Sequence, residues 1–319
     1  MEAFVRRFAA CIFDMDGTLC TSRGHPDGHD RISSLTSAAL QRYVAAGGQV
    51  IVATGRPPNA ATQVLDRDLR PGIVSYLVCC DGGCVLAPVA ERTGEWAMVW
   101  EQGLGGACCT RLLSALRANL PAGALHVGVQ LHEGFDGFGA YGSIVSSRRV
   151  QEVLEECHPK WGEVIRNMVA TGQRTAADVA ARSPRVLTPE AFEATVGETE
   201  VLGWVRVVYE AESRSEPPDL TTVLQPLVEA ENAIHGSNLG FVREHLAGPN
   251  TAMLRQAGTD KATALAVVAD LVDVRAADCC AFGDGDNDVG MFDWAGWAVA
   301  PANCGPEARE MADTLMSKS

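Results

Sequence analysis

The sequence predicts an α/β fold, a Rossmann-like parallel sheet core into which a second, α+β domain is inserted. Short apolar runs at 8–13, 49–53 and 73–80 have the length and continuous hydrophobicity of strands buried on both faces of a parallel sheet. Helical patterns follow the first two runs, as βαβ units require. After residue 84 the segments become alternating or β-branched, and the first pattern returns at residue 257. We therefore expect a core domain at 1–84 and 257–319 and an inserted domain at 85–256.

The composition indicates a globular protein with two domains and excludes several classes of partner. The chain has 319 residues, of which 47% are hydrophobic, and its mean hydropathy is +0.03. A net charge of −14 and a pI of about 4.9 disfavour binding to nucleic acid or to anionic membranes. No apolar stretch reaches the roughly 18 residues of a membrane span, and the N-terminal apolar run ends in acidic residues rather than at a signal-peptide cleavage site.

Cysteine and histidine usage gives no sign of a zinc or disulfide framework. Eleven cysteines without a Cys-x-x-Cys pair predict buried, reduced thiols in a cytoplasmic protein. Residues 21–34 are rich in Gly, His, Asp and Ser and predict a loop, placed to fold as a flap over the end of the first strand. His25 and His29 lie in this loop, and its composition favours plain loop residues over a metal pair.

Two carboxylates, Asp14 and Asp16, follow the first predicted strand at once, and Gly17 and Thr18 then turn the chain. Acidic groups at the exit of a buried strand are costly, because each must be desolvated or paired. Ligands of open α/β sheets bind at the carboxyl ends of the strands. The pattern therefore favours chemistry on a cation or a phosphoryl group over a plain solvated turn.

The second predicted strand ends in a different set of polar groups. A helix is expected at 35–46, and the strand at 49–53 runs directly into Thr54, Gly55 and Arg56. Pro57 and Pro58 suit the first turn of a further helix. Backbone N–H groups and the helix dipole at such a helix start favour an anion.

The inserted segment contains its own strands and helices. The third core strand ends at Asp81-Gly82-Gly83. Beyond it, β-branched or alternating runs predict strands and periodic runs predict helices, which together indicate one α+β domain. The predicted strands are 96–100, 125–131, 201–209 and 241–245, and the helices are 108–119, 149–157 and 220–232.

The last part of the chain again combines strand ends with polar residues. Thr259 or Asp260 can cap a helix at 258–270, and Lys261 in its first turn opposes the helix dipole by roughly 0.3–1 kcal/mol, which favours a lysine that faces an anion over a plain surface lysine. A strand at 278–282 leads into Gly283-Asp-Gly-Asp-Asn-Asp288, a set of hard oxygen ligands that suits Mg²⁺. No glutamate completes a calcium loop. A strand at 297–300 and a helix at 307–316 close the chain.

Four motifs together carry a resemblance to a known family. The strings are Asp-Met-Asp-Gly-Thr from Asp14, Ala-Thr-Gly-Arg from Ala53, the helix that begins at Lys261, and Gly-Asp-Gly-Asp-Asn-Asp from Gly283. In this order they resemble the haloacid dehalogenase superfamily of phosphohydrolases, in its Cof-type sugar-phosphatase branch with a large α/β cap. The resemblance covers about 150 core residues, and the cap matches by position and size only. An Asn-Gly pair commonly stands in this branch where the present chain has Asp81 and Gly82.

The resemblance implies catalytic and metal-binding roles. Asp14 would attack phosphorus and form an aspartyl-phosphate. Asp16 would protonate the leaving oxygen and later deprotonate the attacking water. Mg²⁺ would be held by the Asp14 carboxylate, the Asp16 backbone carbonyl and Asp284. Asp288 would orient Lys261 or metal-bound water.

It also implies how the phosphate is held. Thr54 and the backbone at Gly55 would bind one phosphoryl oxygen, and Lys261 would neutralise both the phosphate and Asp14. Asn287 would contact the phosphate as well. Arg56 is expected to stabilise the loop or the cap side.

The sequence thus predicts a Mg²⁺-dependent phosphohydrolase of small phosphorylated metabolites, with sugar phosphates favoured. A phosphomutase of the phosphomannomutase type and a non-catalytic binding protein are the alternatives; the Arg56 motif favours the hydrolase, and the complete residue set argues against the binding protein. We expect a monomer or weak dimer without a nucleic-acid or membrane partner. The cap is expected to close over the strand ends and to select the substrate.

Overall fold

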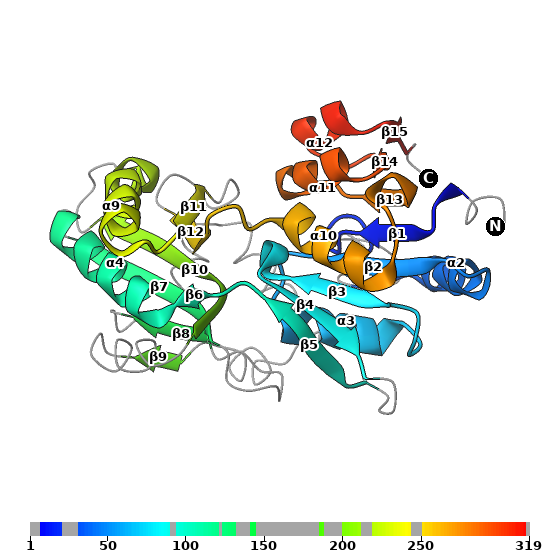
Figure 1. Cartoon of the computed structure of the whole chain (residues 1–319), viewed down its shortest axis with the longest axis horizontal. Helices are drawn as coiled ribbons and strands as arrows, with labels where there is room; N and C mark the ends of the chain where they lie inside the picture. Colours follow the sequence, from blue (N-terminus) through cyan, green and yellow to red (C-terminus); the bar gives the residue numbers. More distant parts are fainter. Residues whose placement is uncertain are drawn as a thin grey trace, which may run out of the picture. The chain divides into compact units, whose positions relative to one another are not determined.

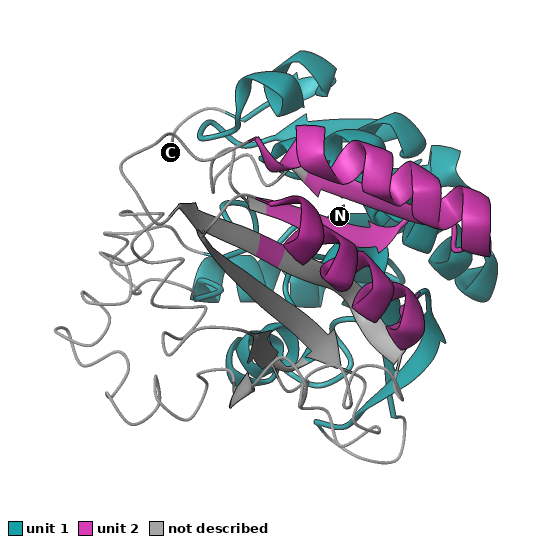
Figure 2. Cartoon of the chain, turned by 90° about the vertical axis from the view of Figure 1, so that its left-hand side faces the viewer, with its two compact units in different colours: residues 1–102, 258–319 teal, residues 103–257 magenta. Residues whose placement is uncertain are grey.

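The chain divides into two compact units, one formed by residues 1–102 and 258–319 and the other by residues 103–257 (Figures 1 and 2). The coordinates are a computed structural model. Two expectations lie outside the described residues, namely the flap with His25 and His29 and the helix at 149–157. The structure describes residues 7–20, 31–89, 94–120, 123–131, 141–144, 185–187, 200–211, 219–243 and 251–316.

The larger unit is built on a mostly parallel sheet. Its described residues form eight strands in the order β15-β14-β13-β1-β2-β3-β4-β5. The strands from β15 to β3 run parallel, and β4 and β5 join antiparallel. This confirms the predicted fold class. The strands are β1 (Ala10–Phe13), β2 (Gln49–Ala53), β3 (Tyr76–Cys79), β4 (Cys84–Pro88), β5 (Trp96–Glu101), β13 (Cys279–Phe282), β14 (Trp297–Ala300) and β15 (Thr314–Leu315).

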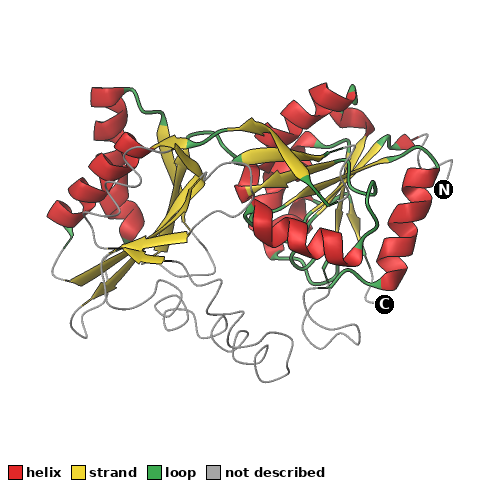
Figure 3. Cartoon of the chain, turned by 90° about the horizontal axis from the view of Figure 1, so that it is seen from below, coloured by secondary structure: helices red, strands yellow, loops and turns green. Residues whose placement is uncertain are grey.

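Helices cover both faces of this sheet (Figure 3). On one face Ile12 and Ile51 of the sheet share a buried core with Leu265 and Met291 from two helices. Burial of each such side chain contributes roughly 1.5–3 kcal/mol. The α-helices of the unit are α2 (Ser34–Ala45), α3 (Pro58–Asp68), α10 (Lys261–Val272), α11 (Val289–Trp294) and α12 (Pro306–Met311), and the 3₁₀ turns are η1 (Cys80–Gly82), η2 (Ala276–Asp278) and η3 (Asp286–Asp288).

In this strand order β1 lies at the topological switch point of the sheet, because β2 and β3 are added on one side of it and β13, β14 and β15 on the other. β1 pairs with β2 on one side and with β13 on the other. The crevice at the carboxyl ends of such strands is where open α/β sheets bind ligands. Asp14, Thr54 and Gly283 each follow one of these three strands directly.

The predicted boundary after residue 84 is wrong, because the core sheet continues beyond it. β4 pairs antiparallel with β3, with Cys79 opposite Cys84, and β5 pairs with β4. The strand expected at 96–100 therefore belongs to the larger unit. The alternation that suggested a new domain instead marks two antiparallel strands at the sheet edge, where one face is less covered.

The C-terminal helix is shorter than predicted. α12 ends at Met311, and the chain then forms β15, which pairs with β14. The 307–316 segment has helical composition throughout. In its second half, however, the backbone hydrogen bonds between β15 and β14 outweigh the helix propensity of the residues. The third strand also begins later than predicted, at Tyr76.

In its described residues, the smaller unit is a mostly antiparallel sheet, in which β8 and β9 pair in parallel, with two helices packed on it. Seven of its described strands belong to this sheet, in the order β11-β12-β10-β7-β8-β9 with β6 beside β10. α4 and α9 lie side by side (Figure 2), and their leucines share one buried cluster with Val207 and Leu254 of the sheet. The elements are β6 (Leu104–Gly105), α4 (Gly106–Asn119), β7 (Gly123–Leu131), β8 (Tyr141–Ile144), β9 (Arg185–Leu187), β10 (Glu200–Ala211), α9 (Leu220–His235), β11 (Leu239–Arg243) and β12 (Thr251–Gln256).

An ion pair joins the two helices of this unit. Nε and Nη2 of Arg111 on α4 donate to the carboxylate of Glu231 on α9, at 2.6 Å for the shortest contact, and the Ser237 hydroxyl donates to the same carboxylate at 2.7 Å. The Glu231 side chain is 7% exposed. The hydrogen bonds from Arg111 hold the pKa of Glu231 below its usual range.

Arg111→Ala is expected to destabilise the protein by roughly 1.5–3 kcal/mol, because charge-assisted hydrogen bonds to a buried carboxylate are lost. We expect a value at the lower end of this range, because the Arg111 side chain is 40% exposed and solvent screens its charge. The lowered Glu231 pKa means that the contribution is present above the ordinary glutamate value and is lost as the pH falls through the lowered one. Urea unfolding of both proteins should show a difference at neutral pH that shrinks in acid; an equal difference at both pH values would contradict this origin.

Two further findings concern membrane-spanning helices and disulfides. Within the described ranges, no helix is long and apolar enough to cross a membrane. The ten cysteines of those ranges are all buried and free of disulfides.

Candidate active site

A buried lysine links two of the predicted strand-end carboxylates. Lys261 is the first residue of α10 and is 1% exposed. Its Nζ donates to Asp14 Oδ1 and to Asp288 Oδ1, both at 2.6 Å. The expectation that this lysine faces anions therefore agrees with its contacts. Its ammonium group is buried and is paired with carboxylates rather than with solvent.

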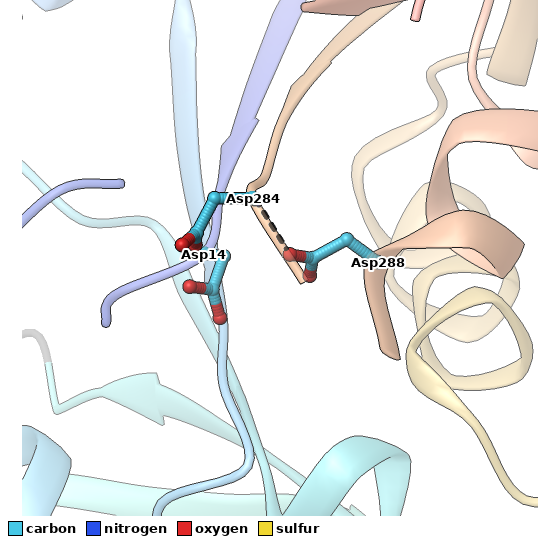
Figure 4. Close-up of side chains that lie close together, drawn as sticks. All are labelled: Asp14, Asp284 and Asp288. Carbon is cyan, nitrogen blue, oxygen red and sulfur yellow. Dashed lines mark hydrogen bonds between the residues drawn. The ribbon is translucent and has the colours of Figure 1, made fainter. Parts of the chain in front are cut away.

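Three carboxylates form a compact cluster around this ion pair. One carboxylate oxygen from each of Asp14, Asp284 and Asp288 lies within 4.8 Å of the others, and Figure 4 shows the side chains together. Asp288 Oδ2 accepts the backbone N–H groups of Asp284 and Gly285 at 2.9 and 3.0 Å. Both oxygens of Asp288 are thus engaged by donors within the protein.

The Asp284 carboxylate is held by two neighbouring loops. Its Oδ1 accepts the hydroxyl of Thr18 at 3.1 Å, and its Oδ2 accepts Nδ2 of Asn303 at 3.2 Å. It lies directly over Gly17, where an added Cβ would be 2.1 Å from Oδ2, and Gly17 has a φ of +86°. Only glycine meets both conditions without strain.

The electrostatics of the cluster follow from its burial. Burial raises the pKa of Asp14 well above its usual range, although the Lys261 ammonium acts in the opposite direction. Burial also raises the pKa of Asp284 to about 6. For Lys261 burial alone would lower the pKa, but attraction to Asp14 and Asp288 outweighs it and raises the value. The site thus contains three carboxyl groups and a single ammonium group, so that negative charge exceeds positive charge when the carboxyl groups are ionised.

This donor set fits a divalent cation. Mg²⁺ takes hard oxygen ligands and is commonly held by one or two carboxylates. Asp14 and Asp284 are the side chains that would hold it, because the oxygens of Asp288 already accept from Lys261 and two backbone N–H groups. A bound cation would stabilise the ionised carboxylates of Asp14 and Asp284, whose pKa values burial raises.

Asp16 lies apart from this cluster and pairs with Arg56. Nε of Arg56 donates to Asp16 Oδ2 at 2.7 Å and Nη2 to Oδ1 at 2.5 Å, a bidentate arrangement. The Asp16 side chain is 61% exposed. Two residues that were predicted separately, at the ends of β1 and β2, are therefore in contact.

Three of the predicted phosphate-holding residues, Thr54, Gly55 and Asn287, are linked through contacts with Asp81 and Arg56. Thr54 is fully buried, and its Oγ1 accepts a hydrogen bond from the backbone N–H of Arg56 at 3.1 Å. Because the hydroxyl acts as an acceptor in this contact, it can still donate its hydrogen to another group. Asn287 is exposed, and its Nδ2 donates to Asp81 Oδ1 at 2.9 Å. Asp81 also packs against Gly55, so the structure brings these four residues together.

Asn303 is a site residue that the sequence reasoning missed. Its Nδ2 donates to the backbone carbonyl of Gly17 at 2.9 Å as well as to Asp284, and it thereby ties the loop after β14 to the loop after β1. The available signal was its position just after a predicted core strand, the same signal that marks Asp14 and Thr54.

A family model for haloacid dehalogenase-like hydrolases matches residues 11–96 and 237–319, which together make up more than half of the chain. The chain belongs to this family. The matched residues contain Asp14, Thr54, Lys261 and Asp284.

Individual members of the family are similar over part of the sequence or in fold. A phosphoglycolate phosphatase of Methanothermobacter thermautotrophicus is 30% identical over 113 residues, 35% of this chain and 45% of that protein. The chain thus spans less than half the length of this curated relative. A haloacid dehalogenase-like hydrolase of Bacteroides thetaiotaomicron has the same fold, with a TM-score of 0.64, 19% identity and 97% and 94% of the two chains covered. A subclass IIB sugar phosphatase does so with a TM-score of 0.60, 15% identity and 96% and 92% covered.

Proposed function

We propose that this member of the haloacid dehalogenase-like family is a Mg²⁺-dependent phosphohydrolase of small phosphorylated metabolites. The observation that carries the proposal is the Asp14–Lys261 ion pair inside a cluster of buried carboxylates at the centre of the sheet. The loop after β1, the start of α10 and the loop after β13 thereby hold together a nucleophile, a compensating cation and oxygen ligands for a metal.

Asp14 is the proposed nucleophile. Its carboxylate attacks phosphorus and forms an aspartyl-phosphate while the ester oxygen leaves; water then attacks the phosphoryl group, and Asp14 and orthophosphate are released. Lys261 holds Asp14 Oδ1 at 2.6 Å and so fixes the direction in which Oδ2 can act. Burial removes competing water from this carboxylate, which is 5% exposed.

Asp16 is the proposed general acid and base. It gives a proton to the leaving oxygen and later takes one from the attacking water. Arg56 binds both of its oxygens in the structure. Arg56 thus acts as the resting-state partner of Asp16, and the exposed carboxylate remains accessible to the leaving group.

Phosphate binding and charge neutralisation come from the remaining residues. When bound, Mg²⁺ would polarise a phosphoryl oxygen and offset the charge that builds up in the transition state. Thr54 can donate its hydroxyl hydrogen, Gly55 its backbone N–H, and Lys261 and Asn287 their N–H groups to the phosphoryl oxygens. Asp288 keeps Lys261 in place through the contact at 2.6 Å.

The substrate is proposed to be a small phosphate ester, with a sugar phosphate first and phosphoglycolate second. The fold of a sugar phosphatase and the partial match to a phosphoglycolate phosphatase support these two classes. The described core-site residues address the phosphate and a cation, so we assign substrate selection to the inserted unit at 103–257.

The test is a screen of sugar phosphates, phosphoglycolate and nucleotides, each with and without Mg²⁺, with released orthophosphate as the readout. We expect release from at least one small ester and a strict requirement for Mg²⁺. Transfer of phosphate between positions of a sugar without release would identify a phosphomutase instead. Neither release nor transfer across the panel would contradict an enzymatic role.

A further inference from the structure

The turn after β3 has an unusual backbone. In η1, Cys80 and Asp81 have φ values of 54° and 51°, in the left-handed region that residues other than glycine rarely adopt. The Cys80 N–H donates to the Arg56 carbonyl at 3.0 Å and the Asp81 N–H to the Thr54 carbonyl at 3.1 Å. Such backbone persists where the surroundings determine it, and it often occurs at functional sites. Here it is bonded to the segment expected to hold phosphate.

The Asp81 side chain is aimed at that same segment. Asp81 is 8% exposed, and a Cβ placed on Gly55 would lie 3.0 Å from Oδ2 and 3.1 Å from Oδ1. The carboxylate therefore lies against the backbone at Gly55. Its Oδ1 also accepts Nδ2 of Asn287 at 2.9 Å, across 206 positions of sequence.

A carboxylate beside a phosphate site repels the phosphate, although Asp81 also attracts the Lys261 ammonium. A carboxylate differs from an amide in another respect: it accepts hydrogen bonds and cannot donate them. Asn287 can therefore meet Asp81 only with its Nδ2 end, whereas two facing amides can bond in either orientation.

We propose that Asp81 is a positioning residue that fixes the side-chain amide of Asn287, so that one N–H binds Asp81 and the second remains for a phosphoryl oxygen. The inference rests on the proposed function and adds a residue to its phosphate site. It gives a use to the acid at this position, because fixed orientation of a donor compensates for the repulsion.

Orthophosphate binding to the Mg²⁺-loaded full-length protein, measured by calorimetry, tests the proposal. Asp81→Gly removes the carboxylate and keeps the left-handed backbone accessible. We expect it to weaken orthophosphate binding about tenfold. Asp81→Asn, which keeps an acceptor and tolerates the same backbone, should recover part of the loss. The control Asp286→Asn removes the exposed acid next to Asn287 and should leave binding equal or slightly tighter.

Each alternative predicts a different result. If charge repulsion dominates, Asp81→Gly binds orthophosphate as well as or better than the wild type, which overturns the proposal. If the carboxylate is only structural, Asp81→Gly lowers Mg²⁺ affinity in parallel with phosphate affinity, which also overturns it. The expected Mg²⁺ affinity is unchanged, because Asp14 and Asp284 do not contact Asp81 through any hydrogen bond of the described residues.

A double-mutant cycle makes the coupling explicit. Asn287→Ala should weaken orthophosphate binding, and the double variant with Asp81→Gly should bind no more weakly than Asn287→Ala alone. Additive losses would contradict the proposal. A wild-type protein that binds orthophosphate but hydrolyses no ester would contradict the proposed function, while the binding comparison would still decide the role of Asp81.

Discussion

Asp14→Asn is expected to abolish turnover, by at least about 10⁴-fold, while the protein remains folded. The amide keeps the shape of the carboxylate and can still accept from Lys261 Nζ, and Asp288 still offsets the lysine charge at 2.6 Å. The amide oxygen is a far weaker nucleophile toward phosphorus than a carboxylate. Release of orthophosphate from the best substrate of the screen, together with thermal unfolding, measures both halves of this expectation.

A matched control separates loss of a nucleophile from loss of a carboxylate charge in an ion pair. Asp68 has a side chain that is 1% exposed and bound by Arg31 and Arg67, in the same unit. Asp68→Asn makes the same chemical change in an ion pair with two partly exposed arginines and should leave the turnover number within about twofold. Residual turnover of Asp14→Asn above a few per cent of wild type would show that another group attacks the phosphate.

Asp284→Ala is expected to raise the Mg²⁺ concentration for half-maximal activity by about 10- to 100-fold. The variant removes one of the two carboxylates available to the cation and also breaks the contacts to Thr18 and Asn303. A Mg²⁺ titration at saturating substrate gives the value. The exposed Asp286 lies two residues away, and Asp286→Ala should leave the half-saturation point unchanged. If the Asp284→Ala value is also unchanged, the metal is bound elsewhere.

The same titration should depend on pH in the wild type. Burial raises the pKa of Asp284 to about 6, so below this value a proton competes with the cation for the carboxylate. The required Mg²⁺ concentration should therefore increase as the pH falls through about 6 and level off above it.

The core of the fold and most of the site were readable from local patterns. A strand buried on both faces is a continuous apolar run, and β1, β2 and β13 each end in the polar group that the structure brings to one edge. Lys261 was recognisable because a cation in a first helical turn is unfavourable without a nearby anion. Each of these signals is local, because it consists of a strand or a helix start and the polar residue next to it.

What the sequence could not supply is the pairing between distant segments. The alternation at 84–101 fits an inserted domain and an antiparallel sheet edge equally well, and only the register of Cys84 with Cys79 distinguishes them. The same holds for side chains: the contact of Arg56 with Asp16 and that of Asn303 with Asp284 join loops from different strands. No local pattern encodes those distances.

The most direct test of the central claim is detection of phosphate on Asp14. Asp16→Asn should slow hydrolysis of the intermediate, because the water-activating base is lost. Acid quenching of this variant during reaction with substrate and Mg²⁺, followed by peptide mass spectrometry, is expected to find one added phosphate on Asp14, and none when Asp14→Asn is combined with Asp16→Asn. Phosphate on a serine, histidine or cysteine, or equal labelling of the double variant, would contradict the mechanism.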